Sequence, residues 1–193
     1  WSNPTVQMLE QKLAALQDTE DCLCTASGMA AASAIVFTVL SAGDHMVISD
    51  VSYAGVAELA RDTLPRMGIH VTPVDMSDLQ AVAAAMRPTT KLVHVESPVN
   101  PIMRLTDIAA VSRLAHAAGA LVSCDATLSS PLGMDTQALG VDLVMHSTTK
   151  YIGGHGDAVG GAVCGSKELI RQLRLEAGIH HGGILSPFNA WLI

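Results

Sequence analysis

Short apolar runs typical of β-strands alternate with helical segments through most of this chain, and this alternation restricts the fold more than any other feature. The strand-like runs are residues 45–50, 68–74, 91–96, 120–125, 142–147 and 158–165, with helical spacing of apolar residues at 56–64, 78–86 and 107–118. Buried strands that alternate with helices are typical of a mainly parallel sheet covered by helices on both faces. We therefore expect an α/β fold, in which the last two runs are close enough in sequence to pair antiparallel.

Two more helices are expected before the first of these strands. Residues 3–17 have amphipathic spacing, with Asn3 or Thr5 as the N-terminal cap. A long apolar helix opens at Ser27 and Gly28 and ends by Gly43. Apolar residues make up 49% of the chain and aromatic residues only 3%, so aliphatic side chains must form most of the core.

The length of 193 residues suits one sizeable α/β domain rather than two. We interpret residues 1–185 as a large domain that lacks the start of its N-terminal segment. Residues 186–193 have the composition of the opening turns of a helix, and we interpret them as the beginning of a C-terminal domain that is absent.

Charge and hydropathy argue against two classes of partner. The formal net charge is −7 and the basic residues are dispersed, whereas a nucleic-acid surface needs clustered Lys and Arg. The longest apolar stretch, residues 29–40, is too short to span a bilayer. We therefore expect a cytoplasmic protein with neither a nucleic-acid nor a membrane partner.

The cysteines and histidines predict neither disulfides nor a metal site. The four cysteines are irregularly spaced among apolar residues, as expected for reduced, packed thiols: Cys22, Cys24, Cys124 and Cys164. No histidine pair has the HExxH spacing, and His155 lies in a glycine-rich loop where a structural role is expected.

Polar residues follow several of the predicted strands at the point where each strand ends. Glu96 and Asn100 follow one run, Asp125 ends the next, and Ser147, Thr149 and Lys150 follow a third. Taken singly, each has an ordinary explanation as a loop, turn or cap residue. In an open parallel sheet, however, ligands bind outside the carboxyl ends of the strands, so we expect these side chains to converge on one rim.

The turn at Ser27 and Gly28 adds an anion site, because the free N–H groups and dipole of a helix start bind phosphate. Neither this turn nor residues 153–161 match the Walker A or GxGxxG patterns, so a nucleotide enzyme is not supported. A phosphate site, a lysine and a strand-end aspartate are together what pyridoxal phosphate requires. The lysine amine forms an imine with the cofactor, and the carboxylate keeps the ring nitrogen protonated.

The stretch "DLVMHSTTKYIGGHGD" (142–157) resembles the lysine signature of the Cys/Met-metabolism, or transsulfuration, family of pyridoxal-phosphate-dependent enzymes. The stretches "NPTVQMLEQKLAALQ", "ASGMAA", "DVSYAG", "ESPVNP" and "CDAT" resemble its other blocks in the same order, so the likeness covers essentially the whole chain. The family includes cystathionine γ-synthase, cystathionine γ-lyase and methionine γ-lyase. The resemblance implies the large cofactor domain of the aspartate-aminotransferase-like (type I) fold.

The resemblance also assigns roles to individual residues. It implies that Lys150 forms the imine and shuttles protons, and that Tyr53 stacks on the cofactor ring and acts as an acid or base near the leaving group. The remaining implied cofactor contacts are Gly28, Met29, Ser147 and Thr149 at the phosphate, Asn100 near the phenolic oxygen, Asp125 at the ring nitrogen, and Thr127 beside it. After Tyr53 the family usually has Gly, then Gly or Cys, then Thr, whereas this chain has Ala54, Gly55 and Val56, and methionine γ-lyases commonly carry cysteine where Gly55 stands. Ala126 is a further departure, since asparagine is usual there.

The implied reaction is elimination or replacement at the γ (or β) carbon of a sulfur amino acid or an O-acylhomoserine, with a carbon–sulfur lyase preferred. A homoserine-ester sulfhydrylase or a cystathionine synthase is the alternative within enzymes. The implied assembly is a homo-oligomer, a dimer of dimers with the active site shared between subunits. The competing hypothesis is a catalytically silent, truncated paralogue or fragment that serves as an assembly or interaction module.

Overall fold

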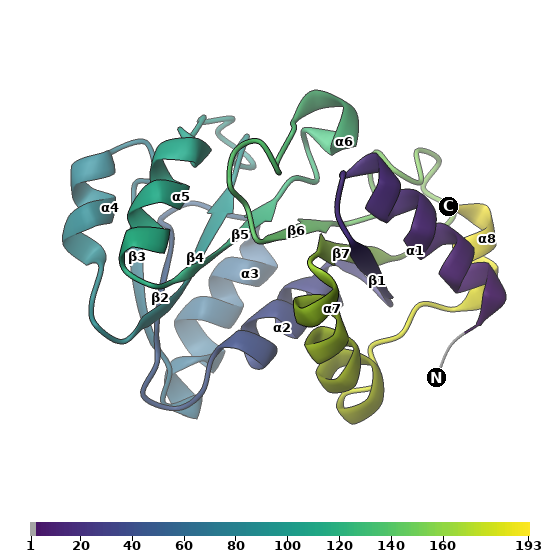
Figure 1. The fold of residues 1–193 in the computed structure, drawn as a ribbon, viewed down its shortest axis with the longest axis horizontal. Helices are drawn as coiled ribbons and strands as arrows, with labels where there is room; N and C mark the ends of the chain where they lie inside the picture. Colours follow the sequence, from purple (N-terminus) through teal and green to yellow (C-terminus); the bar gives the residue numbers. More distant parts are fainter. Residues whose placement is uncertain (1–2) are drawn as a thin grey trace.

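The computed structural model describes residues 3–193, which contain a seven-stranded sheet with the order β1-β7-β6-β5-β4-β2-β3 (Figure 1). Strands β2 to β6 pair in parallel, and β7 is antiparallel to both β6 and β1. The strands are β1 (Asp21–Thr25), β2 (His45–Ser49), β3 (His70–Val74), β4 (Thr90–Glu96), β5 (Leu121–Asp125), β6 (Leu143–His146) and β7 (Gly161–Gly165). The predicted parallel sheet and the antiparallel pairing of the last two runs are confirmed.

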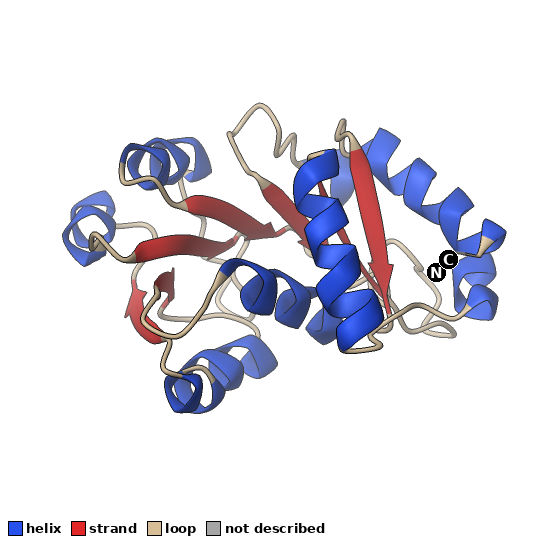
Figure 2. Ribbon diagram, turned by 60° about the horizontal axis from the view of Figure 1, so that its bottom comes forward, coloured by secondary structure: helices blue, strands red, loops and turns tan. Residues whose placement is uncertain are grey.

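Helices cover both faces of the sheet, as Figure 2 shows. Buried residues of α1, α4, α5 and α8 pack on one face, and those of α2, α3 and α7 pack on the other. The helices are α1 (Pro4–Leu16), α2 (Gly28–Val39), α3 (Ala54–Glu58), α4 (Leu79–Ala85), α5 (Ile108–Ala117), α6 (Ser130–Gly133), α7 (Lys167–Leu173) and α8 (Pro187–Leu192). Leu59–Thr63 continues α3 and Arg174–His180 continues α7 as π-helical turns, and Pro65–Met67 is a 3-10 turn.

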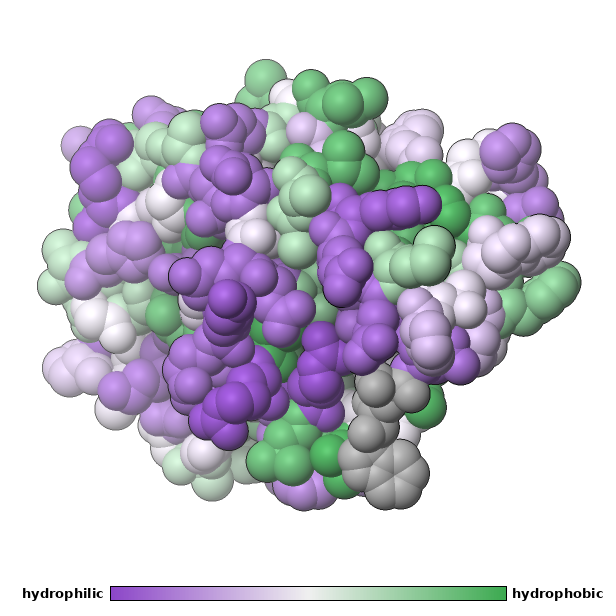
Figure 3. Space-filling view, turned by 45° about the vertical axis from the view of Figure 1, so that its right-hand side comes forward, coloured by the Kyte–Doolittle hydropathy of each residue, from purple (hydrophilic) through white to green (hydrophobic). Residues whose placement is uncertain are grey.

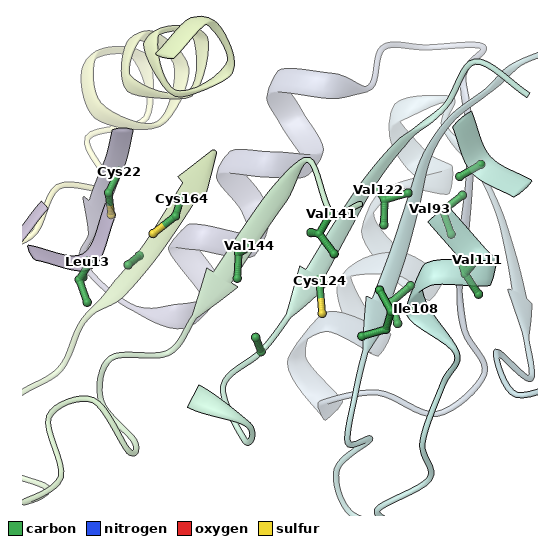
Figure 4. Packing of buried hydrophobic residues seen from close by; sticks show 14 of the residues in the cluster. Leu13, Cys22, Val93, Ile108, Val111, Val122, Cys124, Val141, Val144 and Cys164 are labelled. Carbon is green, nitrogen blue, oxygen red and sulfur yellow. The ribbon is translucent and has the colours of Figure 1, made fainter. Parts of the chain in front are cut away.

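Figure 4 shows the core between the sheet and α1, α4 and α5, where Cys22 and Cys164 lie close together on neighbouring strands. These two residues are Cα partners in the β1–β7 ladder. All four cysteines are buried and free, as predicted for reduced thiols. Burial and contact with Cys164 raise the pKa of Cys22 well above its ordinary value, so its thiol stays protonated.

The helix starts follow from local capping. Asn3 caps α1, because its Oδ1 accepts a hydrogen bond from the Thr5 N–H at 2.9 Å. Ser27 caps α2 in the same way, since its Oγ accepts from the Ala30 N–H at 3.1 Å. Both caps agree with the sequence pattern.

Several elements differ from the expectation. The edge strand β1 and the helices α6 and α7 were not predicted. The helix expected at 56–64 begins two residues earlier, at Ala54, and changes to π-helical geometry at Leu59.

On the face seen in Figure 3, hydrophilic residues form most of the surface and hydrophobic ones lie between them in small groups. Among residues 3–193, no helix is long and apolar enough to cross a bilayer.

Candidate active site

A cavity of about 600 Å³ lies where the carboxyl ends of β4, β5 and β6 meet the start of α2. All nine residues that the sequence assigns to the cofactor line it: Gly28, Met29, Tyr53, Asn100, Asp125, Thr127, Ser147, Thr149 and Lys150. These residues come from five separate segments of the chain. The rim rule predicted the meeting of the three segments that follow strands, the helix start was expected as an anion site, and Tyr53 was implied by the family resemblance. The lining also contains Glu96, whose position at the end of β4 was noted but which received no role.

The start of α2 approaches β6 so closely that only glycine fits at position 28. A Cβ on Gly28 would lie 2.7 Å from the Ser147 Cβ. The first N–H groups of a helix have no intrahelical acceptor, and the hydroxyl of Ser147 lies beside them. Helix start and hydroxyl together form a site for an anion such as a phosphate group.

Thr127 connects the ends of β5 and β6. Its N–H and Oγ1 donate to Asp125 Oδ1 at 3.0 and 2.5 Å, and its Oγ1 accepts from the Ser147 N–H at 2.8 Å. These three bonds fix the Asp125 carboxylate relative to Ser147. Thr127 therefore positions Asp125 and Ser147 relative to each other without carrying charge.

Asp125 is a buried carboxylate, 8% exposed, and it forms no ion pair with any of the residues that the structure describes. Burial raises its pKa, and the two bonds from Thr127 oppose that shift. An unpaired buried carboxylate on a cavity wall is suited to a ligand that brings its own positive charge.

Lys150 lies in a tight turn after β6. Its N–H donates to the Ser147 carbonyl at 3.1 Å, and its own carbonyl accepts from the Gly154 N–H at 2.8 Å. Gly153 is required there, because a Cβ would lie 2.7 Å from the Thr148 carbonyl oxygen. The glycines thus let the backbone fold back beside Lys150, whose exposed side chain borders the cavity.

The hydroxyl of Thr149 is hydrogen-bonded to the backbone of Gly160, which lies just before β7. It donates to the Gly160 carbonyl and accepts from the Gly160 N–H, both at 3.1 Å. Thr149 therefore lines the cavity as predicted, and it also ties the lysine turn to the segment before β7.

His155 and Ala126, which the sequence also marked, form backbone contacts in the structure. His155 is exposed and its Nδ1 lies 2.8 Å from the Gly153 carbonyl oxygen, in keeping with loop support. Ala126 is fully buried and its N–H donates to the Met145 carbonyl at 3.0 Å. In residues 3–193, no group of three His, Cys, Asp or Glu side chains is arranged to hold a metal ion.

Two structural observations indicate that these residues fit pyridoxal phosphate. The buried, unpaired Asp125 suits a protonated ring nitrogen, and the close approach of Gly28 to Ser147 leaves a helix start open to a phosphate. Lys150 supplies an amine at the same cavity. The fold and the cavity thus define the cofactor domain of a pyridoxal-phosphate-dependent enzyme.

The chain belongs to the family of Cys/Met metabolism PLP-dependent enzymes, whose model matches residues 1–193. It is 50% identical over 186 residues to a canavanine γ-lyase of Rhizobium leguminosarum bv. trifolii, covering 96% of this chain and 46% of that protein. It is 43% identical to an O-succinylhomoserine sulfhydrylase of Pseudomonas aeruginosa, covering 100% of this chain and 47% of that protein.

The crystal structure of metB from Corynebacterium glutamicum superposes with a TM-score of 0.96 at 39% identity, covering 99% of this chain and 50% of that chain. The expected family and fold are confirmed. The chain spans about half the length of the relatives that it matches.

Proposed function

We propose that this chain is the cofactor-binding part of an enzyme that eliminates a substituent from the γ carbon of an amino acid. The observation that carries the proposal is the meeting of Lys150, the unpaired Asp125 carboxylate and the α2 start at one cavity. Pyridoxal phosphate, when bound, supplies an electron-accepting ring that stabilises negative charge on the substrate's α carbon. The residues around the cavity then have separable tasks.

At the phosphate end, the N–H groups of Gly28 and Met29 and the hydroxyl of Ser147 would bind the anion. The Thr149 hydroxyl would join them by turning its proton from the Gly160 carbonyl to the phosphate. At the opposite end, Asp125 would hold a proton on the ring nitrogen, with Thr127 keeping the carboxylate in place.

The reacting groups would be Lys150 and Tyr53. The Lys150 amine would attach the cofactor and then move a proton from the α carbon of the substrate to its neighbour. The Tyr53 ring would stack on the cofactor, and its hydroxyl would exchange a proton near the departing group. The Asn100 amide would lie near the cofactor's phenolic oxygen.

Elimination is preferred over replacement because two relatives at 50% and 46% identity are canavanine γ-lyases, against 43% for the O-succinylhomoserine sulfhydrylase. Position 55 supports a pocket unlike that expected for methionine γ-lyases. A Cβ on Gly55 would lie 2.8 Å from Met29 Sδ, so Met29 fills the space that a cysteine there would take. In keeping with the family, we propose as substrate an amino acid with a sulfur- or oxygen-linked γ substituent.

The test is a product assay on the full-length protein with methionine, cystathionine, canavanine, and O-acylhomoserine plus a thiol donor. A keto acid and ammonia indicate elimination, and a new thioether or homocysteine indicates replacement. Lys150→Ala should abolish either product and the visible absorbance of the bound cofactor. Absence of saturable cofactor uptake by the parent protein would support a silent assembly module instead.

We also propose that the enzyme is a cytoplasmic homo-oligomer, a dimer of dimers whose subunits share active sites. The four free, buried thiols support a reducing compartment. Light scattering on the purified protein tests the assembly, and cell fractionation tests the location.

A further inference from the structure

Glu96 binds two segments of the cavity wall at once. Its Oε2 accepts the Tyr53 N–H at 2.7 Å, and its Oε1 accepts the Asn100 N–H at 2.9 Å. One carboxylate thus holds the residue that precedes α3 and a residue in the turn that follows β4. Neither segment hydrogen-bonds the other directly among the residues that the structure describes.

The contacts are well protected from water. Glu96 is 5% exposed and ends β4, where its Cα partner in the parallel ladder is Asp125. Burial raises the pKa of Glu96, the two N–H bonds from Asn100 and Tyr53 oppose this, and the charge of Asp125 adds to it. Because a buried carboxylate is costly to keep charged, these two N–H bonds are what stabilises it there.

The other bonds at the two segments lie away from the cavity. Tyr53 does not cap α3 with its side chain and is 46% exposed, and its carbonyl accepts the N–H groups of Val56 and Ala57. The far side of the turn at Asn100 is held by Arg104, which pairs with Asp50 and with Asp75. At the cavity end of that turn, the Asn100 N–H donates to Glu96.

We propose that Glu96 is a positioning residue that couples Tyr53 and Asn100, so that both side chains are presented to the cofactor together. The inference rests on the proposed function, and it assigns Glu96 no contact with the reacting atoms. Its consequence is energetic: the contributions of Tyr53 and Asn100 to cofactor affinity depend on each other through this carboxylate.

The experiment is a titration of the full-length apoprotein with pyridoxal phosphate, followed by absorbance. Glu96→Gln keeps the shape of the side chain, removes its charge and leaves only one oxygen to accept an N–H. Losing a charge-assisted bond of this kind predicts an affinity lower by roughly tenfold to a hundredfold. Tyr53→Phe and Asn100→Ala, singly and in the Glu96→Gln background, complete a thermodynamic cycle.

Glu10→Gln is the matched control. Glu10 is also 5% exposed and accepts a backbone N–H, from Cys24 at 2.9 Å, but it pairs with Arg174 away from the cavity. This variant should lower the midpoint of unfolding and leave cofactor affinity unchanged.

Coupling is supported if the losses from Tyr53→Phe and Asn100→Ala shrink in the Glu96→Gln background. Fully additive losses, or an unchanged cofactor affinity of Glu96→Gln itself, overturn the coupling. Either result leaves the proposed function standing, because that function is tested by the activity of the parent enzyme. If Glu96→Gln does not fold, hydrogen exchange of the unmodified apoprotein decides the matter. Slow exchange of the Tyr53 and Asn100 amides supports the positioning role of Glu96, and exchange as fast as in exposed turns overturns it.

Discussion

His94 should make the domain sensitive to mild acid. The side chain is 3% exposed, lies beneath Glu96 on the same face of β4, and its Nδ1 is 2.8 Å from Ser123 Oγ. Its Nε2 has no partner among the described residues. Burial lowers the pKa of His94 from 6.5 to about 4.

The sign and size of the effect follow from proton linkage. Between pH 6.5 and 4 the unfolded chain binds a proton at this histidine that the folded chain does not, so acid favours unfolding. A native pKa of about 4 against 6.5 gives a loss of about 2 kcal/mol in unfolding free energy from pH 7 to pH 5. His146, with a pKa lowered to about 4, adds to the total, so the variant must be compared with the parent.

The assay is denaturant unfolding of the apoprotein at pH 7 and pH 5, followed by circular dichroism. His94→Asn can keep the bond to Ser123 and removes the titrating group, so its pH-dependent loss should be smaller by about 2 kcal/mol. His155→Asn controls for replacing a histidine at the surface. Equal losses in the parent and in His94→Asn would refute the reasoning.

Three further outcomes are expected. Gly161→Ala should lower the unfolding free energy by about 1–3 kcal/mol and weaken cofactor binding, because the new Cβ would collide with the Ser27 carbonyl oxygen. Gly133→Ala, whose Cβ meets only Ser129 at 3.7 Å, is the control in both assays. Ser27→Ala should destabilise the apoprotein by about 1 kcal/mol in denaturant unfolding, through loss of the α2 cap. Asp125→Asn should raise the stability of the apoprotein at pH 7, since burial raises the pKa of this carboxyl group, and it should reduce cofactor affinity. Lower stability together with unchanged affinity would contradict this.

Much of the fold and of the site could be predicted because both depend on local pattern and on one general rule. Apolar runs marked five of the parallel-running strands, and the rim rule then placed Asp125, Ser147 and Lys150 at one cavity. The roles of Tyr53 and Thr127 came from the family resemblance alone, since neither stands out by residue type.

The elements β1 and α7 were not predicted, for two different reasons. β1 is only five residues long and pairs with β7, which is remote in the sequence. No local pattern therefore predicts this strand. α7, in contrast, has a Ser166 cap and buried Ile170 and Leu173 at helical spacing, a signal that could have been used. The role of Glu96 was hidden for a third reason: it binds backbone N–H groups, and a sequence does not show which backbone groups a side chain will meet.

Burial at the ends of β4 and β5 carries a cost in free energy that a cationic ligand would reduce. Asp125 and Glu96 are Cα partners with raised pKa values, and His94 beneath them has a lowered one, so burial disfavours the charged form of all three. Nothing in the described chain gives Asp125 a cationic partner, whereas a protonated ring nitrogen would. The same burial that disfavours the charged Asp125 carboxylate strengthens that pairing, because charges attract more strongly away from water. Cofactor binding should therefore stabilise this edge of the sheet as well as equip it for catalysis.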